Sequence, residues 1–381
     1  MKSTDLVVIG GGVIGLSIAY SLAKRGIRAT VLDRQGMGRG ASWAGAGMLP
    51  PFLCRNPISP MVELRSWSAV LYREWSAELR ERTGQDNGYR VCGSIEIALE
   101  PAEVQEIKTA AGRWRVEGIR YERLAAQDLQ NLEPALNPSC LHAFLVPDRA
   151  QIRNPWHLRA LEAANRSLGV EIIPDLLVHR LNVQGRRVIS IETENGRLSC
   201  GQVVVAAGAW SGGLLKELRI ELPTPPLKGQ MVLFQHDHAV VRRIIERGKM
   251  YLVPRMDGRI LMGATEEDAG FDTRTTQEGQ QSLIGQALTI CPALAQAKVE
   301  QSWAGLRPGS LDTRPYLGLI SEYDNLWVAT GHKRAGLQLA PASAEVIANL
   351  IIGHDPGMDL TAFSPGRLSG SDRTVPESKH G

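Results

Sequence analysis

A glycine-rich loop near the amino terminus constrains the fold of this 381-residue chain more than any other feature. The loop has the sequence Gly-Gly-Gly-Val-Ile-Gly at residues 10–15, and it follows a continuous apolar run at residues 6–9. Apolar residues at helical spacing come next and predict a helix that Gly26 ends, and a second apolar run at residues 29–32 ends in Asp33. Apolar runs rich in β-branched residues are typical of buried parallel strands, so the segment predicts a strand–loop–helix–strand unit.

Each glycine of this loop has a physical role in binding a dinucleotide. Gly10 allows the tight turn, Gly12 lets a pyrophosphate approach the backbone, and Gly15 lets the helix pack closely on the strand. The helix amino terminus then offers free N–H groups and the positive end of its dipole to the phosphates. Asp33 can accept hydrogen bonds from the adenosine ribose hydroxyls. We therefore predict a dinucleotide site rather than a purely structural turn.

The loop alone does not separate NAD from FAD, but the rest of the chain favours FAD. A second buried strand signature at residues 203–205 continues into Ala-Ala-Gly, and a flavin-like stretch occupies residues 331–338. One extended cofactor held by segments from the whole chain suits this arrangement. A nicotinamide enzyme more often completes its cofactor site within one contiguous domain.

Glycine-rich buried strands at the beginning, middle and end of the chain predict one nucleotide domain assembled from separate segments. Two further strands are predicted at residues 172–183 and 188–193. We predict an α/β fold (α+β overall), with a Rossmann-like FAD-binding domain at residues 1–84, 146–219 and 321–364. A second, mainly antiparallel-sheet substrate-binding domain is predicted at residues 85–145 and 220–320. The polar residues 365–381 are expected to form a flexible tail.

Composition disfavours several classes of protein. Lys and Arg number 43 against 40 Asp and Glu, a net charge of +3, and no basic run is interleaved with aromatics, so no nucleic-acid partner is expected. The apolar stretch at residues 6–22 is short and glycine-rich for a membrane span, and no signal-peptide pattern follows it, so we expect a soluble protein without a membrane partner. The five cysteines form no Cys-x-x-Cys pair, which predicts no metal site, no disulfide framework and a cytoplasmic location. They are Cys54, Cys92, Cys140, Cys200 and Cys291.

Six segments in order resemble the D-amino-acid oxidase superfamily, and most of all its glycine oxidase branch, which is associated with thiamine biosynthesis. They have the sequences VVIGGGVIG (residues 7–15), GASWAGAGML (40–49), VVAAGAW (204–210), MYLVPR (250–255), GLRPG (305–309) and GHKRAG (331–336). The resemblance extends over nearly the whole chain, to about residue 360.

The resemblance implies which residues hold FAD. Small residues between 41 and 48 would lie along the flavin, because they permit close backbone approach. The backbone of Val178 would meet the adenine, and residues 332–338 would lie beneath the isoalloxazine ring, where N–H groups and a helix dipole can stabilise negative charge. The full predicted cofactor set is Gly10, Gly12, Val13, Ile14, Gly15, Asp33, Arg34, Ala41, Ser42, Ala46, Gly47, Met48, Val178, Gly208, His332, Lys333, Arg334, Ala335, Gly336, Leu337 and Gln338.

The resemblance also implies a substrate site. Arg307 matches the arginine that clamps the substrate carboxylate, and a guanidinium offers two parallel donors for that purpose. Tyr251 matches a pocket tyrosine that hydrogen-bonds the carboxylate, and Arg334 matches a second arginine near the substrate. Glu266 stands where some glycine oxidases have an apolar residue. It would alter amine recognition if it faced the pocket and would change nothing if it faced solvent.

The resemblance implies oxidation of glycine, and of sarcosine and small D-amino acids, to the 2-oxo acid, ammonia and hydrogen peroxide. It further implies non-covalent FAD, oxygen as acceptor, glycine imine for the thiazole of thiamine, and a homotetramer. Sarcosine oxidase is a rival, although its flavin is attached through a cysteine and no cysteine follows Cys291. A quinone-linked D-amino-acid dehydrogenase is a second rival. A flavin-stabilised binding module is disfavoured by the presence of Arg307, Tyr251 and Arg334. A tRNA-modification module would need a basic face, which a net charge of +3 disfavours. Substrate preference, electron acceptor and oligomeric state stay open.

Overall fold

The computed structural model describes residues 3–51 and 57–368, and its contacts divide the chain into two compact units. The first unit comprises Met1–Ser42, Leu161–Pro226 and Arg307–Gly381, and the second comprises Trp43–Ala160 and Leu227–Leu306. Cys54 lies between these two ranges and is therefore outside the described residues.

The first unit is built on a sheet whose central strands are parallel. Neighbouring strands pair in the order β9, β2, β1, β12 and β19, all parallel, and β18 adds an antiparallel edge. The amino-terminal half of β12 pairs antiparallel with β11, and β11 in turn pairs antiparallel with β10. The bounds are β1 Ser3–Ile9, β2 Ala29–Leu32, β9 Glu171–Ile173, β10 Val178–Gln184, β11 Arg187–Thr193, β12 Gly196–Val205, β18 Tyr316–Leu319 and β19 Leu326–Thr330.

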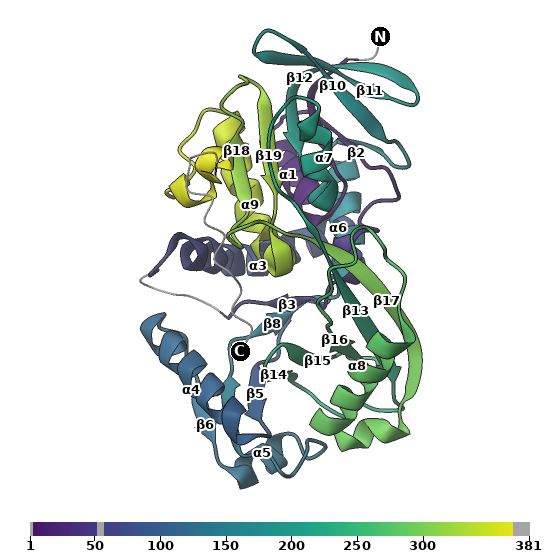
Figure 1. Ribbon diagram of the computed structural model, residues 1–381. Helices are drawn as coiled ribbons and strands as arrows, with labels where there is room; N and C mark the ends of the chain where they lie inside the picture. Colours follow the sequence, from purple (N-terminus) through teal and green to yellow (C-terminus); the bar gives the residue numbers. More distant parts are fainter. Residues whose placement is uncertain (1–2, 52–56, 369–381) are drawn as a thin grey trace. The chain divides into compact units, whose positions relative to one another are not determined.

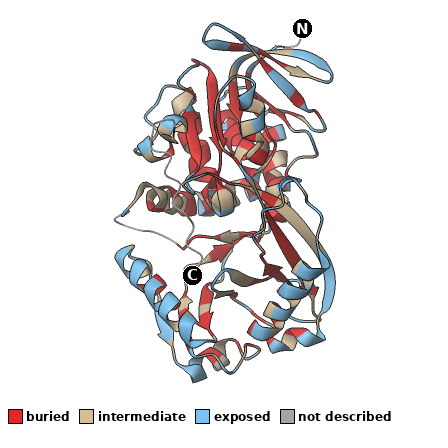
Figure 2. Ribbon diagram, in the orientation of Figure 1, coloured by how far each residue is buried: buried red, intermediate tan, exposed pale blue. Residues whose placement is uncertain are grey.

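Two apolar helices cover this sheet, α1 (Val13–Lys24) and α9 (Gly336–Ile351), and they pack against each other (Figure 1). The strands β2 and β19 are buried along their length, and β1 and β12 are buried over their carboxyl-terminal residues 6–9 and 203–205, as the red segments in Figure 2 indicate. This is why their sequences are continuous apolar runs rather than alternating ones. Shorter helices complete the unit: the carboxyl-terminal half of α6 (Asn154–Ser167), η1 (Gly208–Trp210), α7 (Ser211–Lys216), η3 (Lys333–Ala335), η4 (Thr361–Phe363) and η5 (Pro365–Leu368).

The second unit contains a larger, mainly antiparallel sheet in the order β17, β13, β16, β15, β14, β5, β7 and β6. The ladder between β14 and β5 is parallel, whereas those from β13 to β14 and from β5 to β6 are antiparallel. The bounds are β5 Ser94–Ala98, β6 Glu122–Leu124, β7 His142–Val146, β13 Pro226–Gln235, β14 Ile244–Arg247, β15 Met250–Pro254, β16 Arg259–Gly263 and β17 Lys298–Pro308.

A small three-stranded sheet and five further helices belong with this second sheet. In the small sheet, β8 (Ala150–Gln151) pairs with both β3 (Met48–Leu49) and β4 (Arg90–Val91). The helices are α3 Pro60–Thr83, α4 Pro101–Val116, α5 Ala126–Leu132, α8 Gln277–Ile290 and η2 Pro292–Gln296, while α2 (Ala41–Ala44) spans the boundary between the units.

The predicted fold class is confirmed, with a mostly parallel, helix-covered sheet in one unit and a mainly antiparallel sheet in the other. The predicted strand at residues 6–9 lies within β1, and the one at 29–32 coincides with β2. The helix expected to end at Gly26 is α1, whose last residue is Lys24. The segment at residues 172–183 was expected as one strand, but it divides into β9 and β10, which occupy different places in the sheet.

The division by contacts differs from the predicted domain bounds. Residues 43–84 and 146–160 group with the second unit, because β3, β8 and β4 pair with one another there. Residues 220–226 and 307–320 group with the first unit. The predicted tail also does not begin at residue 365: Pro365–Leu368 is a 3-10 helix in which Arg367 bonds Asp312 at 2.8 and 2.9 Å. Residues 369–381 lie outside the described residues.

Candidate functional site

The glycine loop of the first unit has the close backbone contacts that a dinucleotide loop requires. Gly10 has a φ of +114° and donates its N–H to Leu32 O at 2.7 Å. A Cβ on Gly10 would collide with Ala206 O, and a Cβ on Gly15 would collide with Gly10 O. Any side chain at either position would therefore push apart β1, β12 and α1.

The amino terminus of α1 is left open for an anion. Gly12 is its N-cap residue, so no side chain caps the helix from that position, and its first turn contains no acid. Val13 N donates to Ser42 Oγ at 2.9 Å, which fixes Ser42 beside the loop. Ile14 and Gly15 follow in the first turn, where backbone N–H groups point out of the helix. This end of α1 therefore offers backbone donors and a positive dipole to a phosphate.

Asp33 holds the loop as well as facing the ligand position. Its Oδ2 accepts from Gly11 N at 2.6 Å and its Oδ1 accepts from Gln35 N at 2.8 Å. Burial raises the pKa of the Asp33 carboxyl, and the two backbone hydrogen bonds and Arg34 act against that rise. Each carboxylate oxygen retains a second lone pair, which can accept from a ribose hydroxyl.

Arg34 and Val178 lie close to Asp33 at the same end of the sheet. The Arg34 guanidinium stacks 3.4 Å from the ring centroid of Trp210, which follows Gly208 in η1. Val178 begins β10, and Leu176 N, two residues earlier, donates to Asp33 O at 2.8 Å. The first unit thus brings together the predicted adenosine-end residues from three separate segments of the chain.

The segment at residues 330–338 is tied to the Gly208 turn. Thr330 Oγ1 donates to Gly208 O at 2.9 Å, and Ser211 Oγ donates to Thr330 Oγ1 at 3.1 Å. His332 is buried, with Nε2 3.2 Å from Ser343 Oγ, and burial lowers the pKa of its imidazole to about 3. His332 is therefore neutral at physiological pH.

The start of α9 repeats the open geometry of α1. Lys333, Arg334 and Ala335 form η3, and Ala335 is the N-cap of α9 without a side-chain cap bond. Gly336, Leu337 and Gln338 form the first turn, which contains no acid. Two helix amino termini without acids in the first unit fit an FAD molecule, whose pyrophosphate and reduced ring both carry negative charge.

The second unit fixes the predicted flavin residues Ala46, Gly47 and Met48 against the segment that follows β8. Gly47 has a φ of +79°, and a Cβ on it would overlap Ile152 O. Ile152 N donates to Gly47 O at 2.8 Å, and Met48 pairs with Gln151. Ala41 lies across the unit boundary, in the first turn of α2.

Tyr251 lies in an apolar cluster of this same unit. The buried members include Ala46, Met231 and Ala264, and Met48, Cys92 and Trp303 pack against them from partly buried positions. Trp303 Nε1 donates to Ala44 O at 3.1 Å, and its ring lies 5.2 Å from that of Trp43. Tyr251 therefore belongs to the same apolar cluster as the predicted flavin residues Ala46 and Met48.

The other two predicted substrate residues belong to the first unit. Arg307 is partly buried near the end of β17, and Arg334 is exposed in η3. Their roles at a substrate carboxylate stay predictions.

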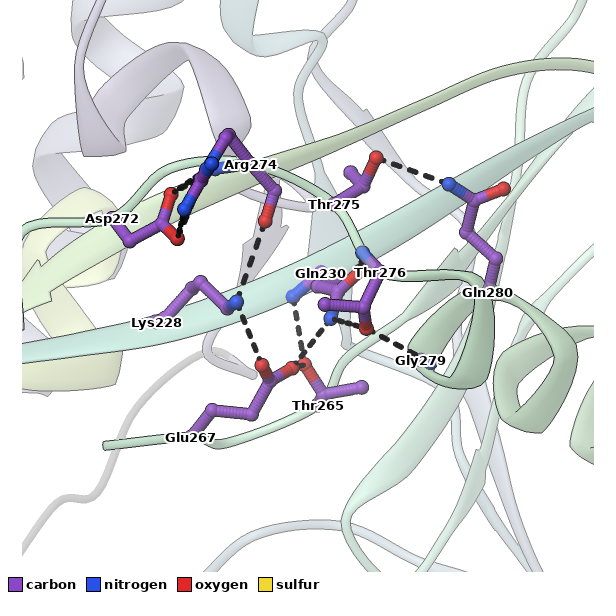
Figure 3. Close-up of polar contacts among 10 residues, drawn as sticks. All are labelled: Lys228, Gln230, Thr265, Glu267, Asp272, Arg274, Thr275, Thr276, Gly279 and Gln280. Carbon is purple, nitrogen blue, oxygen red and sulfur yellow. Dashed lines mark hydrogen bonds and ion pairs between the residues drawn. The ribbon is translucent and has the colours of Figure 1, made fainter. Parts of the chain in front are cut away.

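Glu266 is exposed. Its two neighbours, Thr265 and Glu267, belong to the polar network that Figure 3 shows. Glu267 Oε2 pairs with Lys228 Nζ at 2.9 Å, and its Oε1 accepts from Gln230 and Thr265. Burial acts to raise the pKa of Glu267, but these hydrogen bonds outweigh it and hold the pKa below its ordinary value. Backbone hydrogen bonds from Thr265 N to Gln230 O and from Glu267 N to Lys228 O fix the chain on both sides of the exposed Glu266.

Sequence reasoning missed four residues that shape these sites: Arg255, Met231, Gly263 and Trp303. Arg255 stood within a recognised motif but had no assigned partner, and its three acceptors lie about one hundred or more residues away in sequence. Among the described residues, no group of three His, Cys, Asp or Glu could hold a metal ion. Within residues 3–51 and 57–368, no helix has both the length and the apolar character needed to cross a membrane.

Comparisons with known proteins agree with a chain that binds FAD. Residues 5–350 match the sequence profile of the family described as FAD dependent oxidoreductase. A glycine oxidase from Pseudomonas aeruginosa is 36% identical over 369 residues, covering 96% of this chain and 100% of the relative. The crystal structure of glycine oxidase from Geobacillus kaustophilus superposes with a TM-score of 0.92 at 32% identity, covering 97% of this chain and 100% of that one. A bifunctional protein ThiO/ThiG from Nostoc is 35% identical over 380 residues, which are 99% of this chain and 57% of that protein.

Proposed function

Because the chain belongs to the FAD-dependent oxidoreductase family and to its glycine oxidase branch, we propose that it oxidises glycine and supplies glycine imine for the thiazole of thiamine. The observation that carries the proposal is similarity over the full length of a glycine oxidase, together with a glycine loop and Asp33 that fit FAD. Sarcosine and small D-amino acids are proposed as further substrates, with oxygen as the electron acceptor.

FAD supplies the two-electron acceptor for this reaction. Overall, glycine, oxygen and water give glyoxylate, ammonia and hydrogen peroxide, unless the imine is consumed before it hydrolyses. The chain contributes binding and orientation, because no side chain need act as an acid or base if the amine is bound neutral.

Arg307 is proposed to clamp the substrate carboxylate with two parallel N–H donors. Its position near the end of a strand supports this, since a strand backbone restricts where the side chain can point. Tyr251 is proposed to donate its hydroxyl to the same carboxylate. Its place in a cluster with Ala46 and Met48 supports a site close to the flavin segment.

The first unit is proposed to hold the adenosine end of FAD at the glycine loop, Asp33, Arg34 and Val178. The open amino terminus of α9 is proposed to face the isoalloxazine ring, where its dipole would stabilise negative charge on the reduced form. Non-covalent attachment is proposed because no cysteine follows Cys291. A cytoplasmic homotetramer is proposed from the family alone.

The experiment that tests this function is peroxide release by the purified yellow protein with glycine, sarcosine, D-alanine and D-proline as separate substrates. We expect the largest kcat/KM with glycine or sarcosine, and one peroxide for each amine consumed. Turnover confined to a bulky D-amino acid would overturn the substrate assignment. Turnover with a quinone but not with oxygen would establish the dehydrogenase alternative.

A further inference from the structure

Three acceptors converge on the guanidinium of Arg255. Its Nη1 donates to Gln151 Oε1 at 2.8 Å and to Ile152 O at 2.9 Å, and its Nη2 donates to Ala46 O at 2.7 Å. All three acceptors are neutral, and all lie in the second unit. The Arg255 side chain therefore joins its own segment to two others, residues 151–152 and Ala46, that are far away in sequence.

Residues 46–49, which Arg255 contacts through Ala46 O, are also restrained by the neighbouring residues 150–152. Residues 46–49 run against residues 150–152, where Met48 pairs with Gln151 and Leu49 pairs with Ala150. Gly47 passes Ile152 O so closely that a Cβ would overlap it. The Arg255 bond to Ala46 O fixes the end of this segment that precedes the ladder.

Arg255 also continues the strand that carries Tyr251. It follows β15 directly, and its N–H donates to Arg259 O at 2.7 Å, which extends the pairing between β15 and β16. Side chains alternate along a strand, so the side chains of Tyr251 and Arg255, four residues apart, point to the same face. Tyr251 and Ala46 also meet in one apolar cluster.

We propose that Arg255 is a positioning residue that fixes residues 46–48 relative to Tyr251, and thereby the flavin relative to the substrate carboxylate. The inference rests on the proposed function for the roles of Tyr251 and residues 46–48. Arginine is required because its planar fork reaches three acceptors in fixed directions, which a lysine ammonium on a flexible stem does not reproduce. A misplacement of 1 Å between reacting groups can cost about 100-fold in rate.

The test compares Arg255→Lys with the control Arg247→Lys. Arg247 is another partly buried arginine of the second unit, bonded to Glu103, Glu100 and Gln286, and it is outside the apolar cluster. In the FAD-free proteins, we expect Arg255→Lys to speed amide hydrogen exchange at residues 46–49 at least tenfold. In the holoenzymes, we expect Arg255→Lys to lower kcat for glycine at least tenfold and to change KM less than threefold. Arg247→Lys is expected to change neither exchange at residues 46–49 nor kcat.

Three results would overturn the proposal: unchanged exchange at residues 46–49, faster exchange with unchanged kcat, or an equal loss of kcat in Arg247→Lys at the same thermal stability. Failure of the proposed function looks different, because the native protein would then not oxidise glycine at all. In that case the exchange measurement, and kcat on whichever amine is oxidised, still decide the role of Arg255.

Discussion

The side chains of Met231 and Tyr251 contact each other across Gly263, which lies on the strand between theirs. Gly263 pairs with Met231 on one side and with Tyr251 on the other, and Tyr251 Oη lies 3.7 Å from Met231 Sδ. A Cβ on Gly263 would lie 2.5 Å from Met231 Sδ and 2.7 Å from Tyr251 Cε2. The tyrosine ring and the thioether can therefore contact each other only because residue 263 has no side chain.

Gly263→Ala is expected to raise KM for glycine about tenfold while FAD stays bound. The added methyl displaces the Tyr251 ring, and overpacking of this kind costs about 1–3 kcal/mol. Steady-state kinetics with flavin content measured on the same sample checks this. Gly285→Ala is the control, because a Cβ there meets nothing within 4 Å. The double variant Gly263→Ala/Met231→Ala should recover most of the loss, and no recovery would speak against this packing.

Gly15→Ala is expected to weaken FAD binding at least tenfold, since its methyl would collide with Gly10 O and move α1 away from β1. Fluorescence titration of the FAD-free protein measures the Kd, and far-ultraviolet circular dichroism establishes that the variant is folded. Gly213→Ala, at an open position of α7, should bind FAD as the native protein does. An unchanged Kd in Gly15→Ala would show that the loop does not hold the cofactor.

Arg307→Ala is expected to raise KM for glycine roughly 30-fold or more and to leave FAD content unchanged. Loss of charge-assisted hydrogen bonds to a carboxylate costs about 2–3 kcal/mol. The matched control is Arg186→Ala, which removes a surface pair with Asp324. Glycine kinetics unchanged in Arg307→Ala would contradict the clamp.

Glu96 makes stability depend on pH. It pairs in register with Glu246, and burial raises the pKa of Glu96 from 4.5 to about 7, with the Glu246 carboxylate acting in the same direction. A carboxyl whose pKa is raised on folding stabilises the protein below its unfolded pKa, and this contribution is lost as the pH rises through about 7. Glu96→Gln should therefore flatten the fall of unfolding free energy between pH 5 and pH 8, by at most ~3 kcal/mol. Urea unfolding at both pH values measures it. An unchanged slope would place the titration elsewhere.

Lys228→Met is expected to lower the unfolding free energy by about 3 kcal/mol, because it leaves Glu267 without its buried cation. Lys228→Met/Glu267→Gln should recover more than half of this loss, since both charges are then removed. Urea unfolding of the two variants gives the comparison. Additive losses would mean that the two residues act independently of each other, despite their 2.9 Å contact.

The cofactor loop could be predicted from sequence because its determinants are local. Gly10, Gly15 and Asp33 lie within one strand–helix–strand unit, and each has a spacing that its role dictates. The strand signature at residues 203–208 and the stretch at residues 331–338 then favoured FAD over NAD, and the comparisons confirm FAD. The additional role of Asp33 in binding Gly11 N was not predictable, because a spacing of residues does not reveal which backbone donors are nearby.

The features that could not be predicted from sequence depend on contacts between segments that are distant in the chain. Arg255 and Ala46 are brought together only when the sheet of the second unit has formed, and the same is true of Met231 and Tyr251. The segment at residues 172–183 was predicted as one strand because Ile, Leu and Val recur along it. Their division reflects different partners: β9 pairs with β2, whereas β10 pairs with β11.

Anaerobic titration of the yellow protein with glycine, followed by admission of air, tests the central claim most directly. The account predicts that glycine bleaches the visible flavin absorbance completely, that air restores it, and that Arg307→Ala requires far more glycine for the same bleaching. A flavin that stays oxidised in glycine but is bleached by a bulky D-amino acid would contradict the account.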